Sequence, residues 1–329
     1  MANIPLSFAI NPYEHVRDLL DGTVRAEGID FTFLRLPTEE IFYRFVRYRE
    51  WDVSEMAFGK LIVLASQEDR SIVAIPVFPS RSFRHSSIYV RSDAGITRPD
   101  HLAGKRIGVP TWSQSASMYS RGMLAHEYGV DLQSIHWHQG GVNQAGRAEN
   151  VNLDLPRWLR LTRVPDRSLS EMLLAGDLDT ILSARPPAPF ASGDPRVRRL
   201  FEDYRAVELA YWEKTGIFPI MHVVAMRREV YERHRWVAMN LFTALETAKN
   251  RSLERLKSMT ESSIPLPWVP EHTRLSRKML GEDFWPYGIE PNRKTLEAFT
   301  QYAFEHGVTA RKVAVEELFP PEVQTFTRV

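Results

Sequence analysis

Cysteine is absent from this sequence of 329 residues. Disulfide bonds, a cysteine nucleophile and metal sites built from thiolates are therefore excluded. The sequence also lacks an apolar run as long as a membrane span. Its first ten residues, MANIPLSFAI, have neither the basic region nor the long apolar region of a secretion signal. We therefore expect a cytoplasmic protein that does not associate with membranes.

Neither sign of charge is in excess, because 42 Lys and Arg side chains oppose 41 Asp and Glu side chains and leave a net charge of +1. A chain without a strong positive field is not expected to bind nucleic acid. With 43% hydrophobic and 25% charged residues, the composition is that of a globular protein. The length is enough for two domains or for one large domain.

Apolar segments alternate with amphipathic segments in the first quarter of the chain. The apolar segments have the length and composition of buried strands: 4–10, 29–36, 51–59 and 70–78. Helices are predicted between them over 13–22 and 37–50, and the second begins with a proline and acidic residues. The segment 51–59, WDVSEMAFG, leads from its strand into a turn. This alternation predicts an α/β fold with a mostly parallel sheet.

The pattern restarts after an arginine-rich segment at 79–93. The second set comprises strands over 104–110, 134–141 and 179–185, a helix that ends at Tyr128 and a helix over 168–178. A long strand over 216–230, a long amphipathic helix and a helical, proline-interrupted tail follow. Two α/β units joined by two extended crossings predict two lobes with a ligand cleft between them. Lobe 1 is expected to comprise 1–88 and 213–329, and lobe 2 to comprise 89–212.

A hydroxyl-rich turn joins the strand over 104–110 to the next helix. It contains the cleft candidates Thr111, Trp112, Ser113 and Ser115. Free backbone N–H groups at a helix N-terminus can hold an anion, although an ordinary serine-capped helix has the same sequence pattern. Ligands of open α/β sheets lie beyond the carboxyl ends of the strands, so we expect this turn to form one side of the cleft. Arg121, farther along the helix, either contacts the anion or caps a neighbouring element.

Five sequence blocks in this order resemble the 4,5-dihydroxyphthalate decarboxylase family: WDVSEMAFG at 51–59, GKRIGVPTWSQSASMYSRGMLAHEYGVDL at 104–132, IHWHQGG at 135–141, LSARPPAPF at 182–190 and TGIFPIMHVV at 215–224. The resemblance implies the two-lobed fold of type II periplasmic binding proteins with a central ligand cleft. It also implies a cytoplasmic carboxy-lyase that removes CO2 non-oxidatively from 4,5-dihydroxyphthalate to give protocatechuate in phthalate breakdown. We expect a small aromatic dicarboxylate as substrate, no cofactor and a homo-oligomer.

This reaction needs a proton donor for the ring carbon and a cation for the carboxylate that stays. His222, in the long crossing strand, is the first candidate for proton transfer, because the pKa of an imidazole lies near neutrality. Arg185, at the end of a strand and before two prolines, is the candidate clamp, because a guanidinium matches a carboxylate in shape. Glu55 follows a strand of the other lobe and either binds the phenols or orients a histidine. The alternatives are a core histidine and structural ion pairs.

Further substrate contacts are expected near the two crossings and along the second sheet. They are His85, Arg81, Phe218 and His138. His136 and His138 alternate along one strand and so face one way, but a third ligand for a metal is not evident, and no metal is expected.

Other functions remain open at this point. The same two lobes without catalysis would make a solute-binding protein for small anions, and the mixed His, Glu and Arg candidates argue against it. Effector domains of transcription factors share the lobes, but no helix-turn-helix segment is evident. A related enzyme that acts on another aryl carboxylate, or that makes pyrimidine or menaquinone precursors on this fold, is the third alternative.

Overall fold

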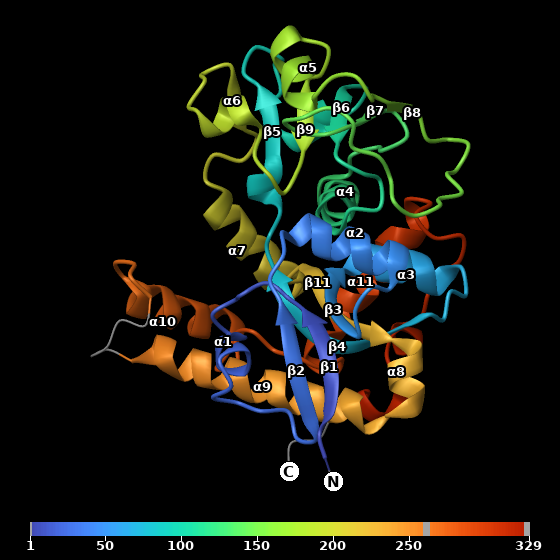
Figure 1. Ribbon diagram of the computed structural model, residues 1–329. Coiled ribbons are helices and arrows are strands. Elements are labelled where there is room, and N and C mark those ends of the chain that lie inside the picture. Colours follow the sequence, from blue (N-terminus) through green and yellow to red (C-terminus); the bar gives the residue numbers. More distant parts are fainter. Residues whose placement is uncertain (1, 259–263, 326–329) are drawn as a thin grey trace.

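The computed structural model describes residues 2–258 and 264–325, and its strands form two separate β-sheets (Figure 1). The first sheet has the strand order β2-β1-β3-β11-β4. Its strands are β1 (Ile4–Ala9), β2 (Ile29–Leu34), β3 (Val53–Ala57), β4 (Ile72–Arg81) and β11 (Ile220–Arg227). The first three strands are parallel, with Ile4 opposite Ile29, whereas β11 is antiparallel to both of its neighbours.

The second sheet has the order β10-β5-β9-β6-β7-β8. Its strands are β5 (Ile88–Arg91), β6 (Arg106–Val109), β7 (His136–Gln139), β8 (Leu161–Arg163), β9 (Thr180–Leu182) and β10 (Val197–Arg199). The four strands from β9 to β8 are parallel, and β5 is antiparallel to β9 and β10. We call the parts built on the first and second sheets lobe 1 and lobe 2. The exact boundaries of the lobes remain predictions.

Both sheets are mixed, and among the described residues five strand pairs are parallel and four are antiparallel. The antiparallel strands include β5 and β11, which are the strands that the chain enters as it crosses between the lobes. The predicted long strand over 216–230 is also too long, since β11 ends at Arg227 and a short helix follows. The helix α3, which follows β3, was not predicted. Eight of its nine residues are buried, so it lacks the polar face that reveals a helix in a sequence.

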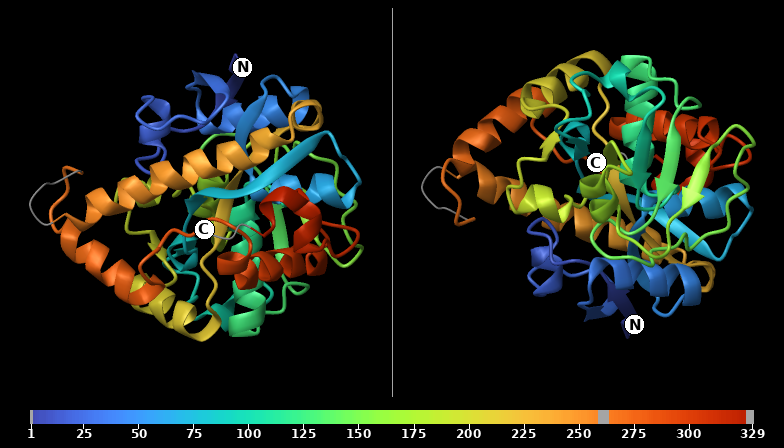
Figure 2. Two further views of the ribbon diagram at one scale, coloured as in Figure 1. Left: turned by 90° about the horizontal axis from the view of Figure 1, so that it is seen from below. Right: turned by 90° about the horizontal axis from the view of Figure 1, so that it is seen from above.

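Helices cover both sheets (Figures 1 and 2). They are α1 (Arg17–Leu20), α2 (Thr38–Tyr48), α3 (Phe58–Ser66), α4 (Ser115–Tyr128), α5 (Leu169–Ala175), α6 (Ala188–Ala191), α7 (Tyr204–Thr215), α8 (Arg228–Arg233), α9 (Trp236–Lys257), α10 (Val269–Leu280) and α11 (Arg293–Glu305). The long helix α9 runs beneath lobe 1, and α2 lies on the side of lobe 1 that faces lobe 2. Within the described ranges, no helix has the length and hydropathy to cross a membrane.

Helix α11 joins the two lobes. The Phe299 ring stacks on Phe58 of α3 and on Tyr119 of α4, with centroid distances of 4.7 Å in both pairs. Just beyond the helix, the carbonyl oxygen of His306 accepts a hydrogen bond from Trp112 Nε1 at 3.0 Å. The C-terminal segment, which we expected in lobe 1, therefore also packs against lobe 2.

Candidate active site

Glu55 and His222 form the centre of a hydrogen-bonded cluster in lobe 1. Glu55 lies opposite Val224 in the antiparallel β3–β11 pair, so its side chain and that of His222 share one face of the sheet. Glu55 Oε1 accepts a hydrogen bond from His222 Nδ1 at 2.6 Å. The Glu55 side chain is fully buried, whereas that of His222 is 20% exposed. His222 Nε2 bonds to no described residue, which leaves this nitrogen available to a ligand.

The loop after β1 completes the cluster. Glu55 Oε2 accepts hydrogen bonds from the Asn11 backbone at 3.0 Å and from Asn11 Nδ2 at 2.7 Å. Tyr13 donates its hydroxyl to Glu55 Oε1 at 2.6 Å and lies 3.3 Å from His222 Nδ1. Since these groups occupy both carboxylate oxygens, Glu55 is placed to orient the imidazole and not to touch a ligand.

Electrostatics fix the protonation state of this cluster. Burial would raise the pKa of Glu55, but the hydrogen bond and charge of His222, together with the Tyr13 and Asn11 hydrogen bonds, hold that pKa below its ordinary value. Burial raises the pKa of Tyr13, and the neighbouring Glu55 charge raises it further. Near neutral pH the cluster therefore contains an ionised carboxylate and a neutral phenol. An ionised carboxylate can only accept, so His222 Nδ1 carries a proton.

Two arginines of lobe 2 face the same helix that contacts His222. Arg147 Nη1 lies 2.7 Å from Glu39 Oε1 in the first turn of α2, and Arg185 Nη2 lies 3.8 Å from the same oxygen. Phe42, three residues farther along α2, contacts His222 edge to face at a centroid distance of 4.7 Å. Side chains three residues apart share one side of a helix, so the arginines and the imidazole flank the same face of α2. Arg185 is 68% exposed, so a ligand can reach its guanidinium.

The hydroxyl-rich turn lies beside this site but is closed by protein contacts. Gly59 N donates to Ser115 Oγ at 2.9 Å, and Lys60 forms short polar contacts with Ser113 and Glu149. A Cβ atom on Gly59 would lie 2.2 Å from the Ser113 carbonyl oxygen, so only glycine allows this approach. With the buried Thr111, Ser113 and Ser115 lie in a joint where the starts of α3 and α4 meet, and their assignment to a ligand cleft stays a prediction.

Comparison with known proteins identifies the family. No protein-family model matches the chain. A curated 4,5-dihydroxyphthalate decarboxylase of Comamonas testosteroni is 36% identical over 322 residues, which cover 98% of each chain. A second protein of that name, from Pseudomonas putida, is 37% identical over 204 residues, covering 62% of this chain and 79% of the relative. This chain belongs to the 4,5-dihydroxyphthalate decarboxylase family.

Solved structures confirm the fold expected for this family. The periplasmic aliphatic sulphonate binding protein of Escherichia coli matches with a TM-score of 0.54 at 12% identity, covering 98% of this chain and 99% of the other. The ligand-binding component of an import system from Staphylococcus aureus matches with a TM-score of 0.52 at 11% identity and covers 98% of both chains. The decarboxylase-family chain therefore has the α/β fold of periplasmic binding proteins.

Trp112 and Arg121 lie inside this decarboxylase-family fold and not at its cleft. The Arg121 guanidinium stacks 3.7 Å from the Trp112 ring centroid, and Arg121 Nη2 donates to the Trp112 carbonyl oxygen at 2.8 Å. Both side chains are fully buried, and burial lowers the pKa of Arg121 to about 9. The turn before α4 and α4 itself place these two side chains in the interior, where Trp112 Nε1 donates to the His306 carbonyl oxygen beyond α11. Their assignment as ligand contacts stays a prediction.

Two other predicted contacts form no hydrogen bond with the Glu55–His222 cluster. His85 is fully buried among the rings of Tyr128, Phe201 and Tyr211. His138 lies half-buried on β7, where burial and the nearby charge of Arg106 lower its pKa. No group of three His, Asp or Glu side chains suited to a metal ion occurs in the part of the chain that the structure describes.

Arg81 and Phe218 line a separate cavity instead of the cleft between the lobes. The Arg81 guanidinium lies 5.1 Å from the Phe218 ring centroid.

Sequence reasoning missed four residues of the candidate site, which are Asn11, Tyr13, Glu39 and Arg147. Asn11 and Tyr13 follow the first strand, so the rule that ligands lie beyond strand ends could have found them. Arg147 lies in a loop without regular structure, and no pattern in the sequence pairs it with Glu39.

Proposed function

We propose that this chain removes CO2 from 4,5-dihydroxyphthalate and releases protocatechuate. The observation that carries the proposal is the His222 imidazole, held through Nδ1 by Glu55 and flanked across α2 by Arg147 and Arg185. This arrangement combines a proton-transfer group with two cations, which are the groups that the reaction needs. The family relationship supports the same reaction, since two curated relatives have this name.

In this proposal, His222 protonates the ring carbon that loses the carboxylate. The step starts from the imidazolium, with a proton on each nitrogen of His222. A hydroxyl group para to the departing carboxylate supplies electron density to the ring carbon, and that carbon takes the proton of Nε2, which leaves the imidazole neutral. The electrons of the bond to the carboxylate then return to the ring as CO2 leaves. Nδ1 keeps its proton and its hydrogen bond to Glu55, so the ring stays oriented throughout. Water restores the Nε2 proton after product release.

The arginines hold the carboxylate that is retained. Glu39 now occupies both guanidinium groups, and a substrate dianion would displace it, because two charge-assisted hydrogen bonds form in one plane. Arg185 is the more exposed of the two and is the better candidate for the bidentate contact. Glu55 is a positioning residue in this scheme, since its oxygens are already used by Asn11, Tyr13 and His222.

The test uses the purified protein and 4,5-dihydroxyphthalate labelled with ¹³C in its carboxyl groups. We expect equimolar labelled CO2 and protocatechuate from this compound. Phthalate, which has no para hydroxyl group, should bind without releasing CO2. Binding of both compounds with no CO2 from either would contradict the proposal and would indicate a solute-binding protein.

We also propose that the enzyme acts in the cytoplasm as a homo-oligomer. Leu266 and Trp268, just before α10, are 64% and 74% exposed, and contiguous exposed apolar side chains mark interaction surfaces, so this pair is the candidate contact. Sedimentation velocity tests the assembly, and Trp268→Ser should shift the protein toward monomer. Cell fractionation with an antibody to the native protein tests the compartment. A monomer at all concentrations, or recovery outside the cytoplasm, would contradict the respective proposal.

A further inference from the structure

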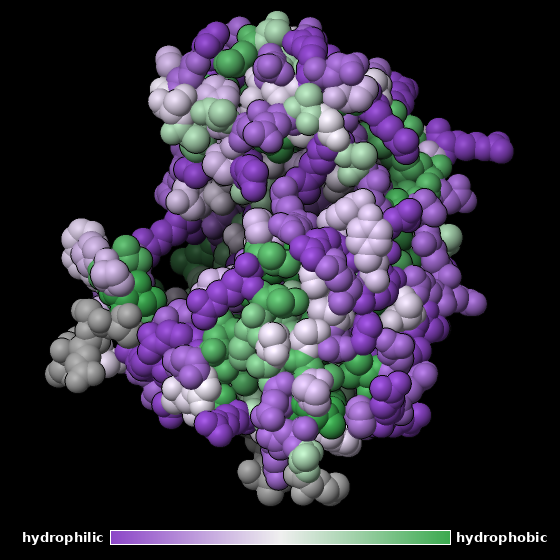
Figure 3. All heavy atoms as spheres, viewed as in Figure 1, coloured by the Kyte–Doolittle hydropathy of each residue, from purple (hydrophilic) through white to green (hydrophobic). Residues whose placement is uncertain are grey.

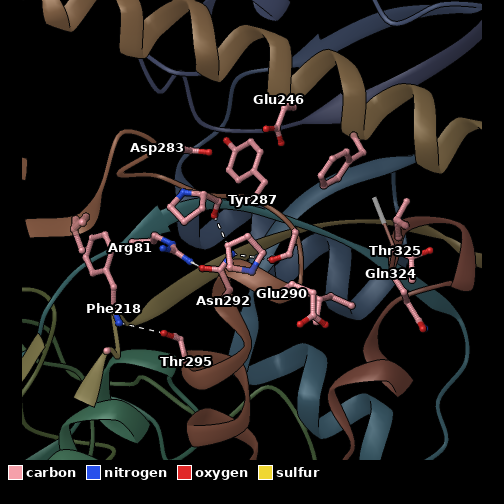
Figure 4. Close-up of a pocket in the computed structure, with 18 of the residues that line it drawn as sticks. Arg81, Phe218, Glu246, Asp283, Tyr287, Glu290, Asn292, Thr295, Gln324 and Thr325 are labelled. Carbon is pink, nitrogen blue, oxygen red and sulfur yellow. Dashed lines mark hydrogen bonds between the residues drawn. The ribbon is translucent and has the colours of Figure 1, made fainter. Parts of the chain in front are cut away.

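A cavity of about 650 Å³ lies between lobe 1 and the arm formed by α9 and α10 (Figure 4). Figure 3 shows a hollow of the surface next to this arm. The cavity is lined by side chains of β4, of the segment before β11, of α9 and of the segment between α10 and α11. Its volume lies in the range of sites for small organic molecules. It contains neither Glu55 nor His222.

Arg81 supplies a buried cation to this cavity. Its residue is 8% exposed, its guanidinium lies over the Phe78 and Phe218 rings, and it forms a short hydrogen bond to Asn292 Oδ1. Arg81 Nε has no hydrogen-bond partner among the described residues. No carboxylate lies within ion-pair distance of Arg81 in the described ranges, although Asp283 is close enough to act on it electrostatically. Burial of a charge without a paired anion is costly, so the cavity favours an anion here.

The opposite side of the cavity is acidic and aromatic. Glu246 and Asp283 line it, and Lys249 contacts both acids, with a distance of 2.8 Å to Asp283 Oδ2. The Tyr287 ring lies between these acids and Arg81 in Figure 4, and its buried hydroxyl has no hydrogen-bond partner in the described part of the chain. This side repels a second carboxylate but can accept hydrogen bonds from hydroxyl groups.

We propose that this cavity is a second binding site, for a hydroxylated aromatic monocarboxylate. The single carboxylate would pair with Arg81 and Asn292, and the ring would lie between Phe218 and Tyr287. Ring hydroxyl groups would donate to the acidic side. A dicarboxylate fits poorly, because Arg81 is the one cation without an acid partner among the described lining residues.

The cavity and the active site lie on opposite sides of one strand. In the β4–β11 pair, Ser80 is opposite His222 and Arg81 is opposite Ile220, and the pairing is irregular between Ile220 and His222, where β11 has one extra residue. Successive residues of a strand point to opposite faces, so Ser80 faces the Tyr13 cluster while Arg81 faces the cavity. A hydrogen bond between Ser80 and Tyr13 supports this orientation. Protocatechuate, the product of the proposed reaction, has the ligand chemistry inferred here, but the inference rests on the cavity alone.

Binding of protocatechuate is measured by equilibrium dialysis, with saturating phthalate present to occupy the active site. We expect one protocatechuate per wild-type chain under these conditions. Arg81→Gln should lose this binding at least tenfold, since a charged partner is removed. Arg84→Gln is the matched control, because Arg84 is an equally buried arginine of the same crossing that does not line the cavity. It should bind like the wild type.

Tyr287→Phe keeps the ring and removes only the hydroxyl group, so it tests the site even if Arg81→Gln does not fold. Its affinity for protocatechuate should fall about fivefold. No binding to the wild type in saturating phthalate would overturn the proposal. Unchanged binding in folded Tyr287→Phe and Arg81→Gln variants would also overturn it. Because dialysis measures no turnover, these outcomes are independent of the CO2 assay.

Discussion

His85 and His222 both lie at places where the chain crosses between the lobes, but their surroundings differ. Three aromatic rings enclose His85, and neither of its ring nitrogens has a partner among the described residues. Burial lowers the pKa of His85 to about 4. His222 instead bonds to an ionised carboxylate through Nδ1 and remains partly exposed. Position at a crossing is therefore not enough to make a proton-transfer group, because the acid partner and the access to ligand decide it.

The largest expected effect is at the acid partner of His222. Glu55→Gln keeps the size of the side chain but removes the charge that orients the imidazole, so kcat should fall on the order of 10²-fold or more. Glu149→Gln is the matched control, because Glu149 is also a buried acid but pairs with Lys60 at the lobe joint. That variant should lose stability and keep kcat within a few-fold. Steady-state kinetics and urea unfolding distinguish the two, and equal kcat losses would contradict the assignment.

The second prediction concerns the clamp. Arg185→Lys keeps the positive charge but loses the paired N–H groups. Its lower kcat/KM should correspond to a loss of about 2–3 kcal/mol of transition-state stabilisation. Arg167→Lys, at an exposed arginine that pairs with Asp177 in the same lobe, should have wild-type kinetics. A folded Arg185→Lys variant with normal kcat/KM would make Arg185 a surface ion-pair residue.

The third prediction concerns His85 and its effect on the free energy of unfolding. The folded-state pKa of His85 is about 4 and the unfolded-state value is about 6.5, so the unfolded chain binds the proton first as the pH falls. His85 should therefore cost the wild type about 2 kcal/mol of unfolding free energy between pH 8 and pH 5. His85→Phe, measured by urea unfolding at both pH values, should lack this part of the loss. The same loss in both proteins would show that His85 is accessible to protons when folded.

The smallest effect is expected at Glu39, which forms ion pairs with Arg147 and Arg185. Glu39→Gln removes a negative charge that competes with the substrate dianion, so KM should fall about threefold, as for a surface ion pair. Glu40→Gln, on the same helix turn but paired with Arg44, is the control and should leave KM unchanged. A higher KM in Glu39→Gln would mean that Glu39 positions the arginines for the substrate.

Much of the fold could be predicted from local pattern. Strand and helix alternation predicts most elements of both sheets, because each has an apolar face or a fully apolar run. Helix α3 was missed since it is buried on all sides, and the antiparallel direction of β5 and β11 is set by the crossings and not by their own residues.

The site was less predictable because its contacts are long-range. Glu55 and His222 are each suggested by their places in the chain, but only the β3–β11 register brings them together. Three arginines that look alike in the sequence differ in burial: Arg185 lies at the surface, whereas Arg121 and Arg81 lie in the interior. A single sequence does not show which arginine faces the cleft.

The most direct test of proton transfer by His222 is a single-turnover measurement on His222→Asn, in which CO2 release and substrate affinity are followed together. Asparagine keeps a polar group of similar reach but cannot deliver a proton. We expect 4,5-dihydroxyphthalate affinity close to that of the wild type and CO2 release slower by roughly 10²–10⁴-fold. Weak binding with a normal rate per bound substrate would contradict it and make His222 a binding residue.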